Sequence, residues 1–288
     1  MNLNQQLLAI HLTQGIGIAT ESRLIEAMNS NLLPSIYPWP LDLLLQITHR
    51  GYHDRIRATY ATALQRASNF KGNYITYPDD NYPQRLREIF EPPLVLFYEG
   101  HLAALNLPSL SVVGTRSATI YGLNSLRHLL PPVIQSSIAI VSGLAQGIDV
   151  MAHQITFANN GVPIAVIGTG TDVAYPRRNT SLQKQIAQQG LVVSEYGPGI
   201  GPHRSHFPAR NRIIAGLSSA TLVVEAKIKS GSLITANAAL QNNREVLSIP
   251  GSIFSEESQG TNELLSLGAK LITKSQDIIE SVQILDTI

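Results

Sequence analysis

Arginine side chains that follow glycine-rich turns are the residues of this sequence best suited to chemistry. Arg116 follows such a turn, and the adjacent pair Arg177 and Arg178 follows Tyr175-Pro176. Residues 201–212 hold three more arginines and two histidines. A guanidinium group grips a phosphate through two parallel hydrogen bonds. The pattern therefore predicts a site for an anionic ligand, although an ion pair is an equal alternative for Arg116 taken alone.

Small residues accompany these arginines. Gly143 lies in the segment Ser142 to Asp149, and hydroxyl residues flank Gly231 in the segment Ser230 to Ala236. A glycine after a strand often serves only as a turn, and Ser230-Gly231 is equally typical of a helix start. None of the glycine segments matches G-x-G-x-x-G in full, and no Gly-Lys-Ser/Thr occurs. We therefore do not favour dinucleotide-dependent hydride transfer or P-loop ATP hydrolysis.

The sequence offers little for metal or covalent catalysis. It contains no cysteine, which removes thiolate zinc sites, iron–sulfur clusters and cysteine nucleophiles. Asp149 and Glu225 lie near the glycine loops, and we expect them to fix loops or cap helices rather than to form a catalytic pair. We predict no catalytic residue, no metal site and no cofactor.

The elements that must position these loops repeat one unit from residue 109 onward, a short apolar run followed by a helical stretch. The intervals between runs are too long for hairpins and suit helical crossovers. Continuous hydrophobicity predicts strands buried on both faces, as in a parallel sheet between helices. The runs are residues 110–113, 138–141, 164–167, 191–193, 221–224 and 246–249. We predict a doubly wound α/β sheet, with ligands beyond the carboxyl ends of its strands.

The N-terminal part has a different texture. Residues 1–70 place apolar side chains at helical spacing and predict a small all-α domain, with Thr20 as a candidate cap of its second helix. Residues 71–288 are assigned to a second domain. It opens with turn signals and one short strand at residues 94–98.

Charge excludes one class of function. Twenty-one Lys and Arg against twenty Asp and Glu leave a formal net charge of +1, so the chain is not a polycation that binds nucleic acid by gross charge. Residues 101–220 nevertheless carry eight basic and three acidic side chains, a net charge of +5. The N-terminus lacks the features of a secretory signal, and no segment is typical of a membrane span. We predict a cytoplasmic protein with no membrane partner.

Several segments form a combination that is specific to one protein family. They are residues 113–116, 142–149 with Ala152-His153, Tyr175-Pro176, Ser194-Glu195, residues 207–214, Glu225-Ala226 with residues 230–236, and Pro250-Gly251. In this order they resemble the bacterial DNA-processing protein family DprA, also called Smf. The resemblance spans about residues 75–273.

The resemblance implies an extended Rossmann-like domain with a mainly parallel sheet. Such a domain binds single-stranded DNA, protects incoming strands during natural transformation and loads the recombinase RecA onto them in DNA recombination. The resemblance also implies a homodimer that catalyses no reaction and, in some members, binding to the single-strand-binding protein. The chain would be the short form of the family, without the C-terminal winged-helix domain.

The N-terminal domain resembles the sterile-alpha-motif-like domain of the same family. Its turn Gly15-Ile16-Gly17 also resembles a helix-hairpin-helix, whose backbone amides grip a DNA phosphate. No Lys or Arg lies within five residues of this turn. A structural or partner-docking role is therefore favoured for this domain.

The family's DNA contacts carry over onto Arg116 and Arg177. Either Phe207 or Tyr175 would offer a ring on which a base stacks, with burial in the core as the alternative. We extend the predicted DNA-binding site to Gly114, Ser117, Gly143, Arg178, Asn179, Arg210 and Arg212.

The alternative function is a nucleotide-phosphate-binding Rossmann enzyme similar to the phosphoribohydrolases. Those enzymes carry a Pro-Gly-Gly-x-Gly-Thr loop, whereas this sequence has only Pro250-Gly251-Ser252. Near the C-terminus, Leu264, Leu265 and Leu267 are candidates for a dimer interface or, equally, for the internal core.

Overall fold

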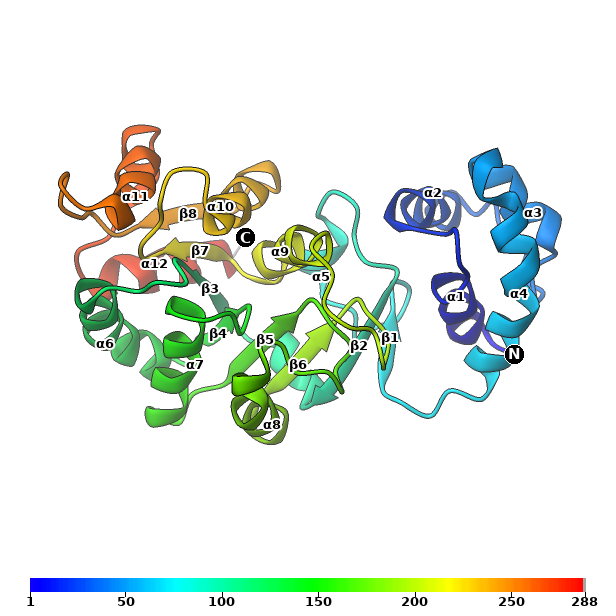
Figure 1. Ribbon diagram of the computed structural model, residues 1–288, viewed down its shortest axis with the longest axis horizontal. Coiled ribbons are helices and arrows are strands. Elements are labelled where there is room, and N and C mark those ends of the chain that lie inside the picture. The colour runs from blue at the N-terminus through cyan, green and yellow to red at the C-terminus, as the bar shows by residue number, and fades with distance from the viewer. Residues whose placement is uncertain (287–288) are drawn as a thin grey trace. The chain divides into compact units, whose positions relative to one another are not determined.

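The computed structural model describes residues 1–286, which form two compact units (Figure 1). The N-terminal unit comprises residues Met1–Tyr82 and Glu91–Phe97, and the C-terminal unit comprises Pro83–Phe90 and the chain from Tyr98 onward. These units differ from a division between residues 70 and 71, because the first strand and part of the second group with the N-terminal helices. The assignment of functional domains stays a prediction.

The first 70 residues are helical, as predicted. Asn2 and Gln5 form a reciprocal capping box at the start of the first helix, and the apolar residues Leu7, Leu8 and Ile10 on that helix are fully buried. A strand pair follows, in which Tyr74 lies opposite Phe97 in an antiparallel register. The elements are α1 (Leu3–His11), α2 (Ile18–Asn29), α3 (Leu41–Ile47), η1 (Arg50–Tyr52), α4 (His53–Ser68), β1 (Tyr74–Thr76) and β2 (Val95–Gly100).

The predicted cap of α2 is wrong. Gly17 is the N-cap residue, and no side chain caps this end of the helix. Thr20 lies inside the first turn, where its amide donates to the Gly17 carbonyl oxygen at 2.8 Å. The preceding Gly15 adopts a φ of +92°, a left-handed conformation that suits glycine.

The C-terminal unit contains the predicted parallel sheet. Its strands lie in the order β6-β5-β4-β3-β7-β8-β9, and each neighbouring pair is parallel. The predicted apolar runs coincide with six of them: β3 (Ser109–Val113), β4 (Ala139–Ser142), β5 (Pro163–Ile167), β6 (Leu191–Ser194), β7 (Ala220–Val223) and β8 (Glu245–Ser248). The short β9 (Lys270–Leu271) was not predicted. The doubly wound mainly parallel fold is therefore confirmed.

Helices alternate with these strands and cover the sheet. Helix α6 contacts α7 and α12, and buried side chains of all three helices belong to one apolar cluster with β3, β4, β7 and β8. The helices are α5 (Gln84–Arg87), η2 (Leu102–Asn106), α6 (Ile120–Gln135), α7 (Ile148–Ala158), η3 (Arg177–Asn179), α8 (Thr180–Gln189), α9 (His206–Leu217), α10 (Gly231–Gln241), α11 (Glu256–Ser266) and α12 (Ser275–Asp286). Across residues 1–286, none of the helices has the length and hydrophobicity required to cross a bilayer.

Strand β3 is the topological switch point of the sheet. From β3 the chain winds one way through β4, β5 and β6, and it then returns to place β7 on the other side of β3. Loops after β3 and β7 therefore diverge at the carboxyl edge. In doubly wound folds this divergence opens a crevice for ligands.

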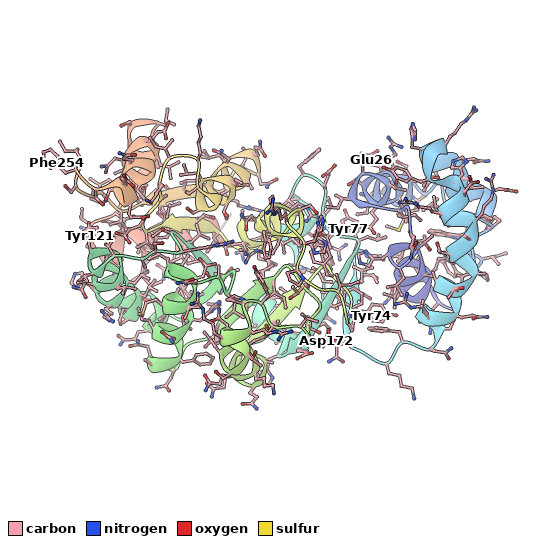
Figure 2. All side chains as sticks on the ribbon, in the orientation of Figure 1. Glu26, Tyr74, Tyr77, Tyr121, Asp172 and Phe254 are labelled. Carbon is pink, nitrogen blue, oxygen red and sulfur yellow. The ribbon has the colours of Figure 1, made fainter. Side chains whose placement is uncertain are left out.

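The apolar residues near the C-terminus divide between core and surface. Leu264 is 6% exposed and belongs to the core, which was one of its two predicted roles. Leu267 is 78% exposed. The exposed aromatic residues include Phe254, on the loop between β8 and α11, and Tyr121, at the start of α6 (Figure 2).

Candidate nucleic-acid interface

Two adjoining pockets lie at the carboxyl edge of the sheet in the C-terminal unit. The larger pocket has a volume of about 500 Å³ and is lined by loops that follow β3, β4 and β7 and by the start of α9. The smaller pocket, of about 140 Å³, is lined by the loop after β4 and by Tyr175, Pro176 and Arg178. Four residues line both pockets: Arg116, Ala145, Phe207 and Arg210. The predicted anion-binding loops are thus brought together at the switch point.

Arg116 and Ser117 project from the loop between β3 and α6. Both residues are exposed and line the larger pocket. The Arg116 guanidinium forms no hydrogen bond or salt bridge with another residue of the described chain. Its charge is therefore available to a ligand. This favours the binding role for Arg116 over the ion pair that was its alternative.

Glycines let these loops approach one another closely. A Cβ atom at Gly114 would lie 2.6 Å from Cγ1 of Ile148 on α7. At Gly147, which has a φ of +85°, a Cβ atom would lie 2.3 Å from the carbonyl oxygen of Thr115. Gly114 therefore contributes to the site by close packing, and its backbone still lines the larger pocket.

Asp149 fixes the loop after β4, as predicted. Its side chain is buried, and Oδ2 accepts hydrogen bonds from the amides of Gly143 at 3.1 Å and Ala145 at 3.3 Å. Burial raises the pKa of the Asp149 carboxyl to about 6, and the charge of Arg210 and the two amides oppose this rise. The carboxyl therefore has a structural role, and Gln146 of the same loop lines the smaller pocket.

Arg210 is a buried charge between the two pockets. It is 5% exposed, and its Nη1 donates to the Val166 carbonyl oxygen at 2.8 Å. Its Nε has no hydrogen-bond partner in the described chain. Burial lowers the pKa of Arg210, the Asp149 carboxylate opposes this shift, and Arg116 adds to it. A Cβ atom at Gly143 would lie 1.6 Å from Arg210 Nη1, so Gly143 makes room for this guanidinium.

The predicted site residues after Tyr175-Pro176 differ in their exposure and contacts. Arg178 is exposed and lines the smaller pocket, and Arg177 is exposed beside it without lining either pocket. Asn179 is buried, and its Nδ2 donates to the Leu144 carbonyl oxygen at 2.8 Å. Asn179 thus ties two loops together, and its side chain is not presented to the pocket.

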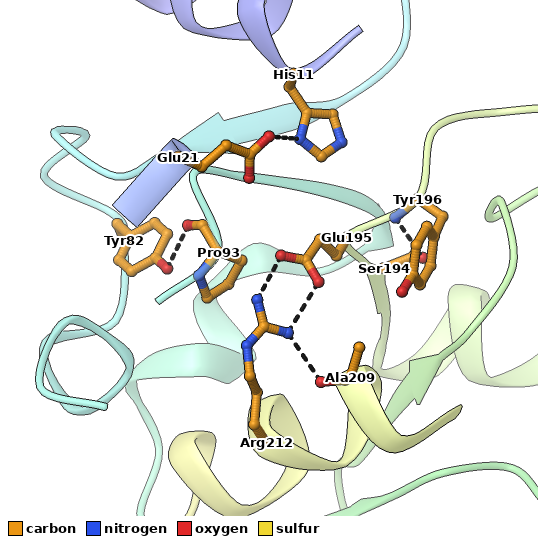
Figure 3. Close-up of polar contacts among 9 residues, drawn as sticks. All are labelled: His11, Glu21, Tyr82, Pro93, Ser194, Glu195, Tyr196, Ala209 and Arg212. Carbon is orange, nitrogen blue, oxygen red and sulfur yellow. Dashed lines mark hydrogen bonds and ion pairs between the residues drawn. The ribbon is translucent and has the colours of Figure 1, made fainter. Parts of the chain in front are cut away.

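Arg212 is another predicted site residue that lines neither pocket, and its guanidinium is bound by neighbouring groups (Figure 3). Its guanidinium donates to Oε1 of Glu195 at 2.5 Å and to Oε2 at 2.8 Å, and also to the Ala209 carbonyl oxygen at 2.8 Å. The side chain of Glu195 is only 4% exposed. A contact from Arg212 to DNA would require this bidentate pair to break. Its role in DNA binding stays a prediction.

An aromatic pair borders the smaller pocket. The rings of Tyr175 and Phe207 lie 5.5 Å apart between centroids with an interplanar angle of 37°. Tyr175 is 45% exposed, and Phe207 is half-buried. Neither ring is in the core. Their use as a stacking platform for bases stays a prediction.

Sequence reasoning missed Lys229 in the loop after β7. Lys229 is exposed, lines the larger pocket and has a φ of +61°. The neighbouring Lys227 also lines this pocket, but its Nζ lies 2.8 Å from Oε2 of Glu256. Two lysines directly before the Ser-Gly-Ser segment were the signal that could have identified this loop. Among the residues that the structure describes, no group of three or more His, Cys, Asp or Glu could hold a metal ion.

A comparison with protein families agrees with this arrangement. Residues 73–283 match the family model of DNA recombination-mediator protein A. The chain belongs to this family. The matched DNA recombination-mediator region includes the whole of the parallel sheet and both pockets.

Individual relatives extend the comparison. The DNA processing protein DprA of Streptococcus pneumoniae is 49% identical over 201 residues, which cover 70% of this chain and 71% of that protein. The X-ray structure of DprA from Streptococcus pneumoniae matches 97% of this chain and 98% of its own, with a TM-score of 0.88 and 38% identity. The structure that describes the single-stranded DNA binding mode of DNA processing protein A from Helicobacter pylori matches 75% of this chain and 97% of its own, with a TM-score of 0.66 and 31% identity.

Proposed function

We propose that this protein binds single-stranded DNA along the two strand-end pockets and loads RecA onto the bound strand. The observation that carries the proposal is the Arg116 guanidinium, which lines both pockets and forms no salt bridge or hydrogen bond within the described chain. The relative from Helicobacter pylori, whose single-stranded DNA binding mode is described, supports the choice of ligand. The family description as a recombination mediator supports the choice of process.

The pockets suit a thin and flexible polyanion. Arg116, Arg178 and Lys229 supply positive charge, and Gln146 supplies neutral donors. Such contacts grip phosphates without reading base edges, so sequence preference is small. A rigid duplex does not fit pockets of 500 and 140 Å³, and it binds weakly.

The finer parts of the proposal extend beyond the pocket. The protein acts by binding rather than catalysis, protects incoming strands in natural transformation, and works in the cytoplasm as a homodimer. RecA and, in some settings, the single-strand-binding protein are its protein partners. The N-terminal helices serve as a sterile-alpha-motif-like module.

The test is binding of the purified protein to a labelled oligonucleotide, single-stranded and as the same sequence in a duplex, over a salt series. We expect tight and salt-sensitive binding to the single strand and weak binding to the duplex. The double variant Arg116→Glu with Arg177→Glu should abolish binding while the fold remains intact. Arg127→Glu, on the exposed face of α6 and outside both pockets, is the matched charge control.

Two results would contradict the proposal. Wild-type affinity in the double variant at moderate salt would remove the assigned site. Absence of binding to either form of DNA would favour a small phosphorylated ligand. Release of free base from a nucleoside monophosphate would then identify the phosphoribohydrolase-like alternative.

A further inference from the structure

Glu225 lies outside both pockets, yet it holds both ends of the loop that carries Arg116. Its backbone oxygen accepts a hydrogen bond from the Thr115 amide at 2.8 Å. Its carboxylate accepts two more from Thr119, one from the amide at 2.9 Å and one from the hydroxyl at 2.5 Å. Bonds to one residue therefore bracket Arg116 on both sides.

The Glu225 carboxylate is itself held in a fixed place. Glu225 is 1% exposed and is the second residue after strand β7. The preceding Val224 donates its amide to the Val113 carbonyl oxygen of β3 at 3.1 Å. A Cβ atom at Gly122 would lie 2.2 Å from Glu225 Oε2, so the first turn of α6 packs directly on the carboxylate. The sheet thus supplies a rigid anchor for a surface loop.

Thr119 links the Glu225 carboxylate to the start of helix α6. Its side-chain oxygen caps α6 by accepting from the Gly122 amide at 3.3 Å, and the same hydroxyl donates to Glu225. Within the loop, Ser117 donates its amide to the Thr115 hydroxyl oxygen at 3.1 Å. The backbone on each side of Arg116 is therefore bonded, whereas the Arg116 side chain is free to meet a ligand.

We propose that Glu225 is a positioning residue for DNA binding, which sets the place of the Arg116 guanidinium by clamping residues 115–119. This inference rests on the proposed function of the pockets. A binding group must be held to within about 0.5 Å of its productive position to act at full strength. An exposed arginine on an unclamped loop loses that precision.

The direction in which DNA affinity changes when the Glu225 carboxylate is removed distinguishes a positioning role from a purely electrostatic one. A carboxylate close to a phosphate site repels the ligand, so on charge alone its removal should strengthen DNA binding. If Glu225 acts through Arg116, its removal should weaken binding. A neutral residue at position 225 that keeps the hydrogen bonds to Thr119 should preserve DNA affinity.

The experiment is a double-mutant cycle between Glu225→Ala and Arg116→Ala, read as affinity for a labelled single-stranded oligonucleotide over a salt series. We expect Glu225→Ala to weaken binding by about tenfold, which corresponds to loss of one charge-assisted hydrogen bond. The same substitution should have no further effect in the Arg116→Ala protein. The slope of log affinity against log salt should fall by about 0.7 in either single variant, because one phosphate contact is lost.

Two variants guard against a merely structural effect. Glu225→Gln retains an oxygen for the Thr119 amide and a donor for its hydroxyl, and it should bind DNA within about twofold of wild type. Ser248→Ala removes a buried hydroxyl on β8 that donates to the Thr261 carbonyl oxygen at 3.0 Å. It should lower stability and leave the salt slope unchanged.

If the Glu225→Ala protein does not fold, the Thr119→Val protein takes its place in the double-mutant cycle. The Thr119→Val substitution removes the hydroxyl that donates to the Glu225 carboxylate. Equal weakening by the Glu225 or Thr119 substitution with and without Arg116 would overturn the inference. Stronger binding by Glu225→Ala would also overturn it. If Arg116→Ala itself left affinity unchanged, the proposed DNA site would fail instead, so the two failures are distinct.

Discussion

Two arginines at the same edge of the sheet have opposite environments. Arg116, on the loop between β3 and α6, is exposed and forms no hydrogen bond or ion pair within the described chain. Arg212, on α9, is 13% exposed in its side chain and makes a bidentate pair with Glu195. Both were predicted to contact DNA. The difference teaches that an arginine beside a ligand loop is available for binding only where no carboxylate occupies it.

The largest expected effect is on stability. Arg212→Ala should lower the free energy of unfolding by about 3–5 kcal/mol, because it leaves the buried Glu195 carboxylate without its partner. Urea denaturation measures this loss, and the affinity of the folded fraction for single-stranded DNA should stay at the wild-type value. If Arg212→Ala weakened DNA binding as strongly as Arg116→Ala, the contrast between the two arginines would be broken.

Arg116→Ala should weaken DNA binding and leave stability nearly unchanged, the reverse of Arg212→Ala. Loss of one charge-assisted contact costs about 1.5–3 kcal/mol, roughly a 10- to 150-fold loss of affinity. The free energy of unfolding should change by less than about 0.5 kcal/mol, since the side chain is exposed and unpaired. Arg127→Ala removes the same charge from an exposed position on α6 and serves as the control. A similar affinity loss in that variant would mean that net charge, and not the site, governs binding.

Buried groups beneath the site should make stability depend on pH in two opposing ways. Burial raises the pKa of Asp149 to about 6, so the folded state takes up a proton more readily and stability rises as pH falls through 6. Burial lowers the pKa of His153 to about 3, so the unfolded state takes up a proton first and stability falls as pH falls below 6.5. The two contributions largely cancel in the wild-type protein.

Single substitutions should separate these contributions. Between pH 7 and pH 5, His153→Leu should gain stability and Asp149→Asn should lose it, each by roughly 1–2 kcal/mol relative to its own value at pH 7. Urea denaturation at both pH values measures the changes. Slopes of the same sign in both variants would contradict the assignment of these protonation states.

The smallest expected change in DNA affinity is at Lys229, a second exposed cation beside Arg116. Like Arg116, it is exposed and lines the larger pocket, but it is a flexible point charge rather than a planar fork. Lys229→Gln should weaken binding by less than about fivefold and reduce the salt slope by about 0.7. Lys227→Gln is the matched control, because Lys227 already pairs with Glu256. A larger effect of the Lys227 variant would reverse the expected roles.

The strands were predictable because burial on both faces requires continuous apolar runs. The runs at residues 110–113 and 221–224 correspond to β3 and β7, within one residue at each end. The two-residue strand β9 escaped prediction, since Lys270-Leu271 carries no apolar run of its own. Thr20 was assigned as a cap from its residue type alone, whereas the observed N-cap residue is Gly17, three residues earlier.

The pockets were more predictable in their location than in their lining. Glycines and arginines after the strands pointed to the edge of the sheet at which both pockets lie. Which arginines face the pocket depended on residues distant in sequence, such as Glu195, which lies 17 positions before Arg212. Asn179 was likewise expected to meet the ligand, but it donates to Leu144, 35 positions away.

The sequence by itself determined the parallel sheet, the glycine turns and the family resemblance, because local hydrophobicity and residue type are written along the chain. Tertiary structure alone decided which charges are free. A guanidinium forms an ion pair only where the fold brings a carboxylate within hydrogen-bond distance, and residue type along the chain does not reveal this distance. Arg212 meets Glu195, Arg210 is enclosed beside Gly143, and Arg116 is left exposed on a loop that Glu225 holds in place.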